Sequence, residues 1–323
     1  MTYMFLFFPY SYLFSFFLFS SALMALSASN WLAAWFAMEL NLLSFIPIMI
    51  SSNYLQELEG ATKYFFSQST GSALILWGAF SAINISHYLI LVGLFLKLGV
   101  APFHFWFPSV MSSTSWETCM ILASWQKLPT LALLFFFSKS YLLFFLMIGS
   151  TSAILGGILG LNQTQLRTLL AYSAVNHTGW IIAIMSISVT ASWLYFIVYI
   201  IISLTLMNMF KTLSSTFFWS YNLVNLVSLA LLLSLGGLPP LSGFAVKLGA
   251  ISLMASLSTP TTMCLIMGAL LGLYYYLCLS FSFLLRSFNF HLSSSPAFSK
   301  KSCTLIILSL MFFTLFSNTF VLL

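Results

Sequence analysis

The chain has 323 residues and a net charge of +6; 61% of its residues are hydrophobic and only 4% are charged. A soluble domain carries roughly 25% charged residues, so this composition excludes an ordinary soluble fold. Apart from the adjacent Lys300 and Lys301, the basic residues are scattered singly through apolar sequence. No basic run alternates with aromatic residues, and we expect no nucleic-acid partner. The sequence begins in apolar residues without a charged leader, so we expect the first helix to be retained in the lipid bilayer.

Apolar segments follow one another along the whole chain, separated by polar, glycine or proline residues. The sequence therefore predicts an all-α polytopic membrane protein with about eleven transmembrane helices, since each crossing needs about 20 apolar residues. In chain order we place them at 5–26, 29–51, 58–83, 87–108, 116–137, 140–161, 164–187, 191–213, 222–257, 260–286 and 303–322.

Two of the predicted helices contain an interruption. The segment 222–257 is too long for one straight helix and contains the run GGLPPLSG from Gly236 to Gly243, so we expect two half-helices joined at membrane depth. The segment 87–108 contains a milder break, GVAP, from Gly99 to Pro102. Broken helices near the bilayer midplane are typical of transporters.

The positions of these breaks indicate an internal repeat. A broken helix is the fourth of five in 1–137 and again the fourth of five in 140–286, and a lysine lies beside each break, Lys97 and then Lys247. Because five crossings is an odd number, the second unit must be inverted relative to the first. We interpret 1–323 as one membrane domain with antiporter-like inverted five-helix repeats, followed by a last helix at 303–322.

Charges in the predicted loops indicate the orientation. One side of the membrane receives most of the basic residues, and the other receives only Lys139. The basic side contains Lys63, Arg167, Lys211, Arg286, Lys300 and Lys301. Since basic loops stay on the cytoplasmic or matrix side, we expect the N-terminus there and the C-terminus on the opposite side.

A glutamate and three lysines fall deep inside predicted spans. Glu39 lies near the centre of the second span, Lys97 of the fourth and Lys127 of the fifth, and Lys247 follows the break of the ninth. A charge at the centre of a transmembrane helix costs roughly 2.5–3.5 kcal/mol on insertion scales. Burial disfavours a protonated lysine and a nearby carboxylate favours it, so a lysine with a movable carboxylate partner can exist in two protonation states.

Two interpretations of these four residues stay open. One is a structural ion pair between Glu39 and a lysine; the other is a relay for protons or cations, for which broken helices free backbone groups and make room for water. His104 and His177 are further relay candidates, with a packed or structural role as the alternative for each. We expect the acidic residues at helix ends, Glu57, Glu59 and Glu117, to be solvated.

A set of short segments occurs in order from about residue 30 to 250: KYFFSQS from Lys63, KLGVAPFHFW from Lys97, WQKL from Trp125, GLNQTQLR from Gly160, NHTGW from Asn176, and GGLPPLSGF from Gly236 with Lys247. In these segments the chain resembles the family of mitochondrial NADH–ubiquinone oxidoreductase chain 2. The first span and the end of the chain resemble that family only in being apolar.

The resemblance implies an antiporter-like subunit in the membrane arm of respiratory complex I. In that family a glutamate matched by Glu39 pairs with a lysine matched by Lys97, Lys127 matches the central relay lysine, and Lys247 matches the lysine of the second broken helix. His104 and His177 match positions on the same hydrophilic axis.

The residues and the resemblance together lead us to expect the redox cofactors on other subunits. The chain has no glycine-rich phosphate loop, cysteine cluster or histidine pair of haem-like spacing, so we expect no cofactor on it. FMN, iron–sulfur clusters, NADH and ubiquinone would bind to other subunits, and the partners would be membrane-arm subunits, including other antiporter-like chains, in the mitochondrial inner membrane. A stand-alone cation/proton antiporter of the same ancestry is the alternative, and a purely structural scaffold of complex I is a third possibility.

Overall fold

The computed structural model describes residues 9–50, 54–81, 86–215, 223–239 and 241–288. These residues form thirteen helices and no strand. The helices are α1 (Pro9–Ser27), α2 (Trp31–Met49), α3 (Leu55–Phe80), α4 (Ser86–Leu98), α5 (Trp106–Ser113), α6 (Trp116–Ala123), α7 (Lys127–Ser138), α8 (Leu142–Leu161), α9 (Leu166–Met185), α10 (Val189–Ser215), α11 (Leu223–Gly236), α12 (Ser242–Ala255) and α13 (Thr259–Phe288). The predicted helix at 303–322 lies outside the described residues.

Helices of membrane-spanning length confirm the predicted class of an all-α polytopic membrane protein. Within the described residues, five segments are both long and apolar enough to cross a bilayer: Trp31–Met49, Trp116–Ser138, Leu142–Leu161, Val189–Thr212 and Thr259–Phe283. A helix of 20 residues is about 30 Å long, which matches the hydrocarbon thickness. Large apolar side chains such as Leu143 and Phe136 are more than two-thirds exposed, as expected of surfaces that face lipid.

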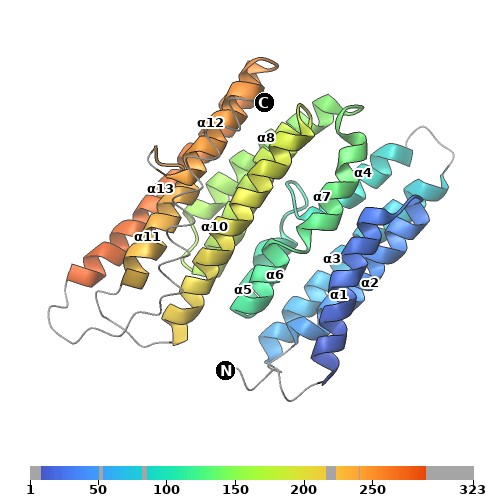
Figure 1. Cartoon of the computed structure of the whole chain (residues 1–323), viewed down its shortest axis with the longest axis horizontal. Helices are drawn as coiled ribbons and strands as arrows, with labels where there is room; N and C mark the ends of the chain where they lie inside the picture. The colour runs from blue at the N-terminus through green and yellow to red at the C-terminus, as the bar shows by residue number, and fades with distance from the viewer. Residues whose placement is uncertain (1–8, 51–53, 82–85, 216–222, 240, 289–323) are drawn as a thin grey trace. The chain divides into compact units, whose positions relative to one another are not determined.

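The chain divides into two compact units. Unit 1 comprises Met1–Ser140 with Thr164–Ala171, and its described part contains α1 to α7 and the start of α9. In unit 1, α3 packs along α2 and α4, and α1 packs on α2 and α7 (Figure 1). The α3–α4 contact is close because Gly71 and Gly93 face each other, and a Cβ atom on Gly93 would lie 2.7 Å from the carbonyl oxygen of Gly71.

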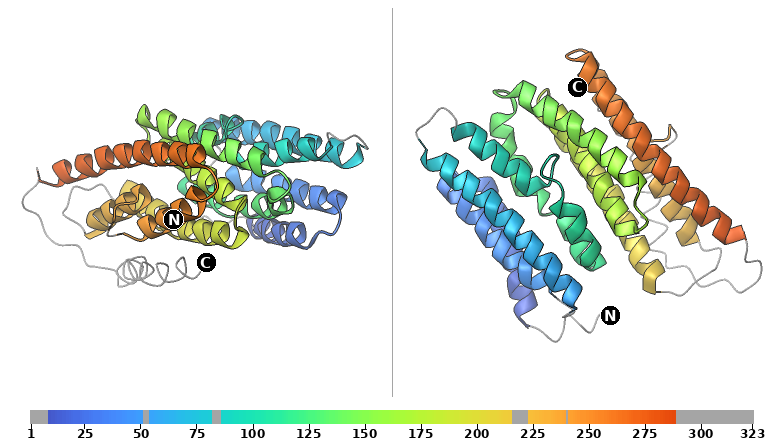
Figure 2. Two further views of the ribbon diagram at one scale, coloured as in Figure 1. Left: turned by 90° about the horizontal axis from the view of Figure 1, so that it is seen from above. Right: turned by 180° about the vertical axis from the view of Figure 1, so that it is seen from behind.

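Unit 2 comprises Tyr141–Gln163 and Tyr172–Leu323. Here α8 packs along α13, and α11 contacts α10, α12 and α13 (Figure 2). Small residues again permit close approach, since a Cβ atom on Gly156 of α8 would lie 2.7 Å from the backbone nitrogen of Asn176 in α9. This is the small-residue packing that holds transmembrane helices together when hydrophobic burial does not discriminate protein from lipid.

The two predicted breaks are present. Helix α4 ends at Leu98, and Gly99 follows with φ +69°, a left-handed backbone conformation that residues other than glycine rarely adopt. Helix α11 ends at Gly236, and Gly237 follows with φ +85°. In both places the chain continues as a second helix. Lys97 and Lys247 therefore each lie within two turns of a helix break.

A third break was not expected. The sequence predicts one continuous helix over 116–137, but α6 ends at Ala123 and α7 begins at Lys127. The backbone N–H of Gln126 bonds to the carbonyl of Ile121, five residues back, and the N–H of Lys127 bonds only three back, to Ser124. This wide turn resembles a π-bulge, a local irregularity that is frequent at functional sites.

Candidate proton-transfer site

Glu39 and Lys97 lie in unit 1, on α2 and in the last turn of α4. Lys97 is 6% exposed, and its backbone carbonyl accepts a hydrogen bond from Gln68 Nε2 at 3.2 Å. The half-buried carboxylate of Glu39 is within electrostatic range of the Lys97 ammonium, yet no direct ion pair joins these two described residues. The two groups are therefore close enough to interact electrostatically without a direct ion pair.

Lys127 opens α7 directly after the unexpected break and is 3% exposed. Its Nζ atom lies 4.8 Å from the centroid of the Phe107 ring, within the range of a cation–π contact. Lys127 therefore lies in the interior of unit 1, directly after the break. There its ammonium form depends on neighbouring groups for stabilisation.

Polar side chains tie the break at Lys127 to other helices of unit 1. Gln126 Nε2 donates to Asn41 Oδ1 at 3.1 Å, and the Tyr64 hydroxyl donates to Gln126 Oε1 at 3.3 Å. Asn41 lies two residues beyond Glu39 on α2, and the indole of Trp125 donates to the carbonyl of Leu18 at 3.3 Å. The three-residue break is therefore anchored to α1, α2 and α3.

Lys247 lies in unit 2 on α12 and reaches back across the second break. Its Nζ atom donates to the carbonyl oxygens of Leu235 and Gly236, both at 2.9 Å. These carbonyls end α11, where the helix dipole is negative, so they stabilise the protonated lysine. The side chain runs against Gly237, where a Cβ atom would lie 2.9 Å from Lys247 Cδ.

His177 and Lys247 line the same cavity, which has room for about one water molecule. The cavity is bounded by α9, α10, α11 and α12, with the rings of Tyr195 and Tyr199 on α10 forming part of its wall. His177 Nδ1 is 3.0 Å from the Tyr195 hydroxyl, and its ring lies 5.1 Å from that of Tyr199. Two of the sequence-predicted residues are thus brought together within unit 2.

His104 lies in the turn between α4 and α5 and is buried, with 1% exposure. Its ring is 4.4 Å from that of Phe105, centroid to centroid. This histidine therefore belongs to the packed part of unit 1, next to the break that follows Lys97.

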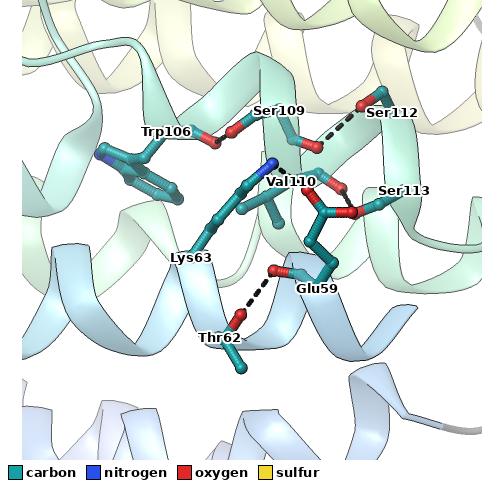
Figure 3. A network of polar contacts seen from close by, with 8 residues as sticks. All are labelled: Glu59, Thr62, Lys63, Trp106, Ser109, Val110, Ser112 and Ser113. Atoms are coloured by element: carbon teal, nitrogen blue, oxygen red, sulfur yellow. Dashed lines mark hydrogen bonds and ion pairs between the residues drawn. The ribbon is translucent and has the colours of Figure 1, made fainter. Parts of the chain in front are cut away.

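The acidic residues at the start of α3 differ from one another. Glu59 forms an ion pair with Lys63 one turn along the helix, and Figure 3 shows the pair facing α5 and its serines. Both side chains are exposed, at 66% and 48%, as expected. Glu57 is only 5% exposed, so the expectation that it is solvated is wrong for the isolated chain.

Related sequences identify the family. The chain is 45% identical to NADH-ubiquinone oxidoreductase chain 2 of Lumbricus terrestris over 273 residues, which are 80% of this chain and 82% of the relative. It is 39% identical to the chain 2 protein of Xenopus laevis over 88% of this chain and 87% of the relative. The chain belongs to the NADH-ubiquinone oxidoreductase chain 2 family.

The match to a broader family model agrees with chain 2 membership. Residues 77–272 match the transmembrane model described as NADH:quinone oxidoreductase/Mrp antiporter. Lys97, Lys127 and Lys247 all lie inside this region, and Glu39 precedes it.

Solved structures share the chain 2 fold at low sequence identity. Respiratory complex I from Thermus thermophilus with bound aureothin contains a chain with a TM-score of 0.79 and 22% identity, covering 96% of this chain and 78% of that one. A chain of the Mrp complex from Dietzia sp. has a TM-score of 0.74 and 17% identity, covering 87% and 60%. These likenesses show a fold common to complex I and to Mrp antiporter assemblies.

Several residues of the site were missed by sequence reasoning, among them the polar residues Asn41, Tyr64, Gln126 and Tyr195. Asn41 and Gln126 carried a signal, because each is polar, lies in an apolar segment and is within two residues of a candidate ionisable group. The tyrosines carried none, since Tyr64 and Tyr195 are two among 14 tyrosines.

Proposed function

We propose that this chain is a proton-translocating membrane subunit of NADH:ubiquinone oxidoreductase in which Glu39, Lys97, Lys127 and Lys247 transfer the protons. The observation that carries the proposal is that three lysines are each more than nine-tenths buried and each lies beside a helix break, in a member of the chain 2 family. Ionisable groups inside a membrane protein are rare because they are costly to bury, and they mark ion and proton pathways.

In the proposed mechanism, energy from NADH oxidation in other subunits reaches Glu39 and Lys97 as a change in their separation. Closing the pair stabilises the protonated Lys97 and removes the carboxylate's influence from its surroundings. Lys127 then changes its affinity for a proton, and Lys247 follows, with His104 and His177 as further relay groups. Each proton moved against the membrane potential requires roughly 2.3 kcal/mol per 100 mV.

The proposal extends to the setting of the chain. It includes about eleven crossings with two inverted five-helix repeats, the N-terminus in the matrix, and the C-terminus towards the intermembrane space of the mitochondrial inner membrane. Other membrane-arm subunits, including antiporter-like chains, are the partners. FMN, iron–sulfur clusters, NADH and ubiquinone are bound by other subunits, and none is assigned to this chain.

Replacing Lys127 tests the proposal. We expect Lys127→Ala to leave the complex assembled and to lower the number of protons translocated per NADH oxidised, measured with the purified complex in liposomes. Lys139→Ala is the matched control, because Lys139 follows the same helix but is exposed. Normal proton translocation by an assembled Lys127→Ala complex would remove Lys127 from the pathway.

The alternative function is a stand-alone cation/proton antiporter, which the common fold with the Mrp complex favours. It would use the same lysines without an electron-transfer partner. Native purification separates the two functions, since a complex I subunit co-purifies with flavin and iron–sulfur proteins. The chain 2 relatives, at up to 45% identity, favour the complex I subunit.

A further inference from the structure

The cavity beside Lys247 contains a tyrosine that the relay described above does not use. The Tyr195 hydroxyl is 3.0 Å from His177 Nδ1, and Tyr195, His177 and Lys247 all line the cavity. The hydroxyl directly contacts the imidazole at this nitrogen. A tyrosine hydroxyl both donates and accepts hydrogen bonds, so it can take part in a chain of proton transfers.

We propose that Tyr195 carries protons between the Lys247 cavity and His177. This inference rests on the proposed function, because it assigns a new member to the same pathway. It names the atoms of one step, the tyrosine hydroxyl and imidazole Nδ1, and it makes Tyr195 the link between Lys247 and His177, two candidate relay residues of unit 2.

The step conserves protons and charge. The Tyr195 O–H bond breaks as its proton moves to the neutral Nδ1 of His177, and a new O–H bond forms with a proton delivered from the protonated Lys247 through a water molecule in the cavity. Lys247 ends neutral, His177 ends as imidazolium and the tyrosine is restored. Two of the three ammonium protons of Lys247 bond to the Leu235 and Gly236 carbonyls, which leaves one for the cavity.

Packing contacts surround the ring of Tyr195. Tyr195 is 3% exposed, and its ring is stacked on that of Trp180 with centroids 6.4 Å apart. Trp180 is itself fully buried. Removal of the hydroxyl alone should therefore leave the ring where it is, which separates a role in proton transfer from a role in folding.

The variant Tyr195→Phe tests the inference, because it removes one oxygen atom and keeps the ring. We expect an assembled complex that oxidises NADH but translocates at least twofold fewer protons per NADH, and whose translocation depends on pH differently from the wild type. Tyr275→Phe is the matched control: Tyr275 is equally buried in unit 2 but does not line the cavity. We expect this control to translocate protons normally.

The outcomes separate failure of this inference from failure of the proposed function. If Lys247→Ala lowers proton translocation and Tyr195→Phe does not, the pathway stands and Tyr195 is not part of it. If neither variant lowers translocation, the proposed function of Lys247 fails as well. A Tyr195→Phe chain that does not assemble would show that the hydroxyl is structural, and it too would overturn the inference.

Discussion

At the scale of single residues, uncharged polar side chains determine how the buried lysines are presented. Gln126 connects Asn41 on α2 with Tyr64 on α3, directly before Lys127. A buried amide is costly without partners, so each of these contacts fixes the direction of its neighbours. The candidate ionisable residues could be identified from the sequence. The polar side chains around them could not, because these lie on helices distant in the chain.

We predict that Gln126→Leu destabilises unit 1 by about 1–3 kcal/mol, because the Asn41 amide loses its partner while it stays buried. Thermal release of the subunit from the purified complex measures this change. Combining it with Asn41→Leu should cost less than the sum of the two single variants, since neither amide is then left unpaired. Additive effects, or an equal loss in the exposed control Gln165→Leu, would contradict the predicted pairing.

At the scale of helices, each of the three breaks has a glycine or a proline at or near it in the sequence. The breaks after α4 and α11 could be predicted because glycine and proline mark them. The break between α6 and α7 falls at Ser124, Trp125 and Gln126, and its sequence signal is Pro129 in the first turn of α7, which cannot bond to the carbonyl of Trp125 four residues back. Contacts with Leu18 and Asn41 anchor the break in the folded unit, and these contacts could not be predicted from the sequence.

We predict that Gly237→Ala disrupts the second break. Its φ of +85° is strained for alanine, at a cost of about 1–3 kcal/mol, and the new methyl group would displace the Lys247 side chain from the carbonyls it binds. Proton translocation per NADH should fall, with partial loss of assembly.

The neighbouring variant Gly236→Ala is the comparison, because the nearest atom to its added Cβ, Tyr276 Cδ2, is at 3.6 Å, an ordinary contact. Its effect should be much smaller. Equal effects of the two substitutions would show that the conformation of Gly237 is not what matters.

At the scale of the whole molecule, composition alone predicts the class, and related sequences establish the family. Only 4% of the residues are charged, which predicts a membrane protein, and the apolar helices of membrane-spanning length confirm this class. The number of crossings and the repeat depend on segments outside the described residues and stay predictions. Which of the buried charges exchange protons also stays a prediction, because it depends on water and on partner subunits.

We predict that Lys139 and Lys211 face opposite sides of the membrane, since the three helices α8, α9 and α10 lie between them. Single cysteines introduced at each position, in a chain without its four native cysteines, should react with an impermeant maleimide from opposite sides of sealed inner-membrane vesicles. Labelling of both from the same side would require an even number of crossings and would refute the proposed topology.

The grip of Lys247 on the end of α11 has a thermodynamic consequence. The ammonium holds two terminal carbonyls across a bend in the chain, so a proton on this lysine and the angle of that bend are linked variables. Any change in the angle of the bend must alter the proton affinity of Lys247. By reciprocity, binding of the proton shifts the equilibrium between bend angles by the same coupling free energy. A movement of neighbouring helices and the arrival of a proton through water would then have the same effect at the break between α11 and α12.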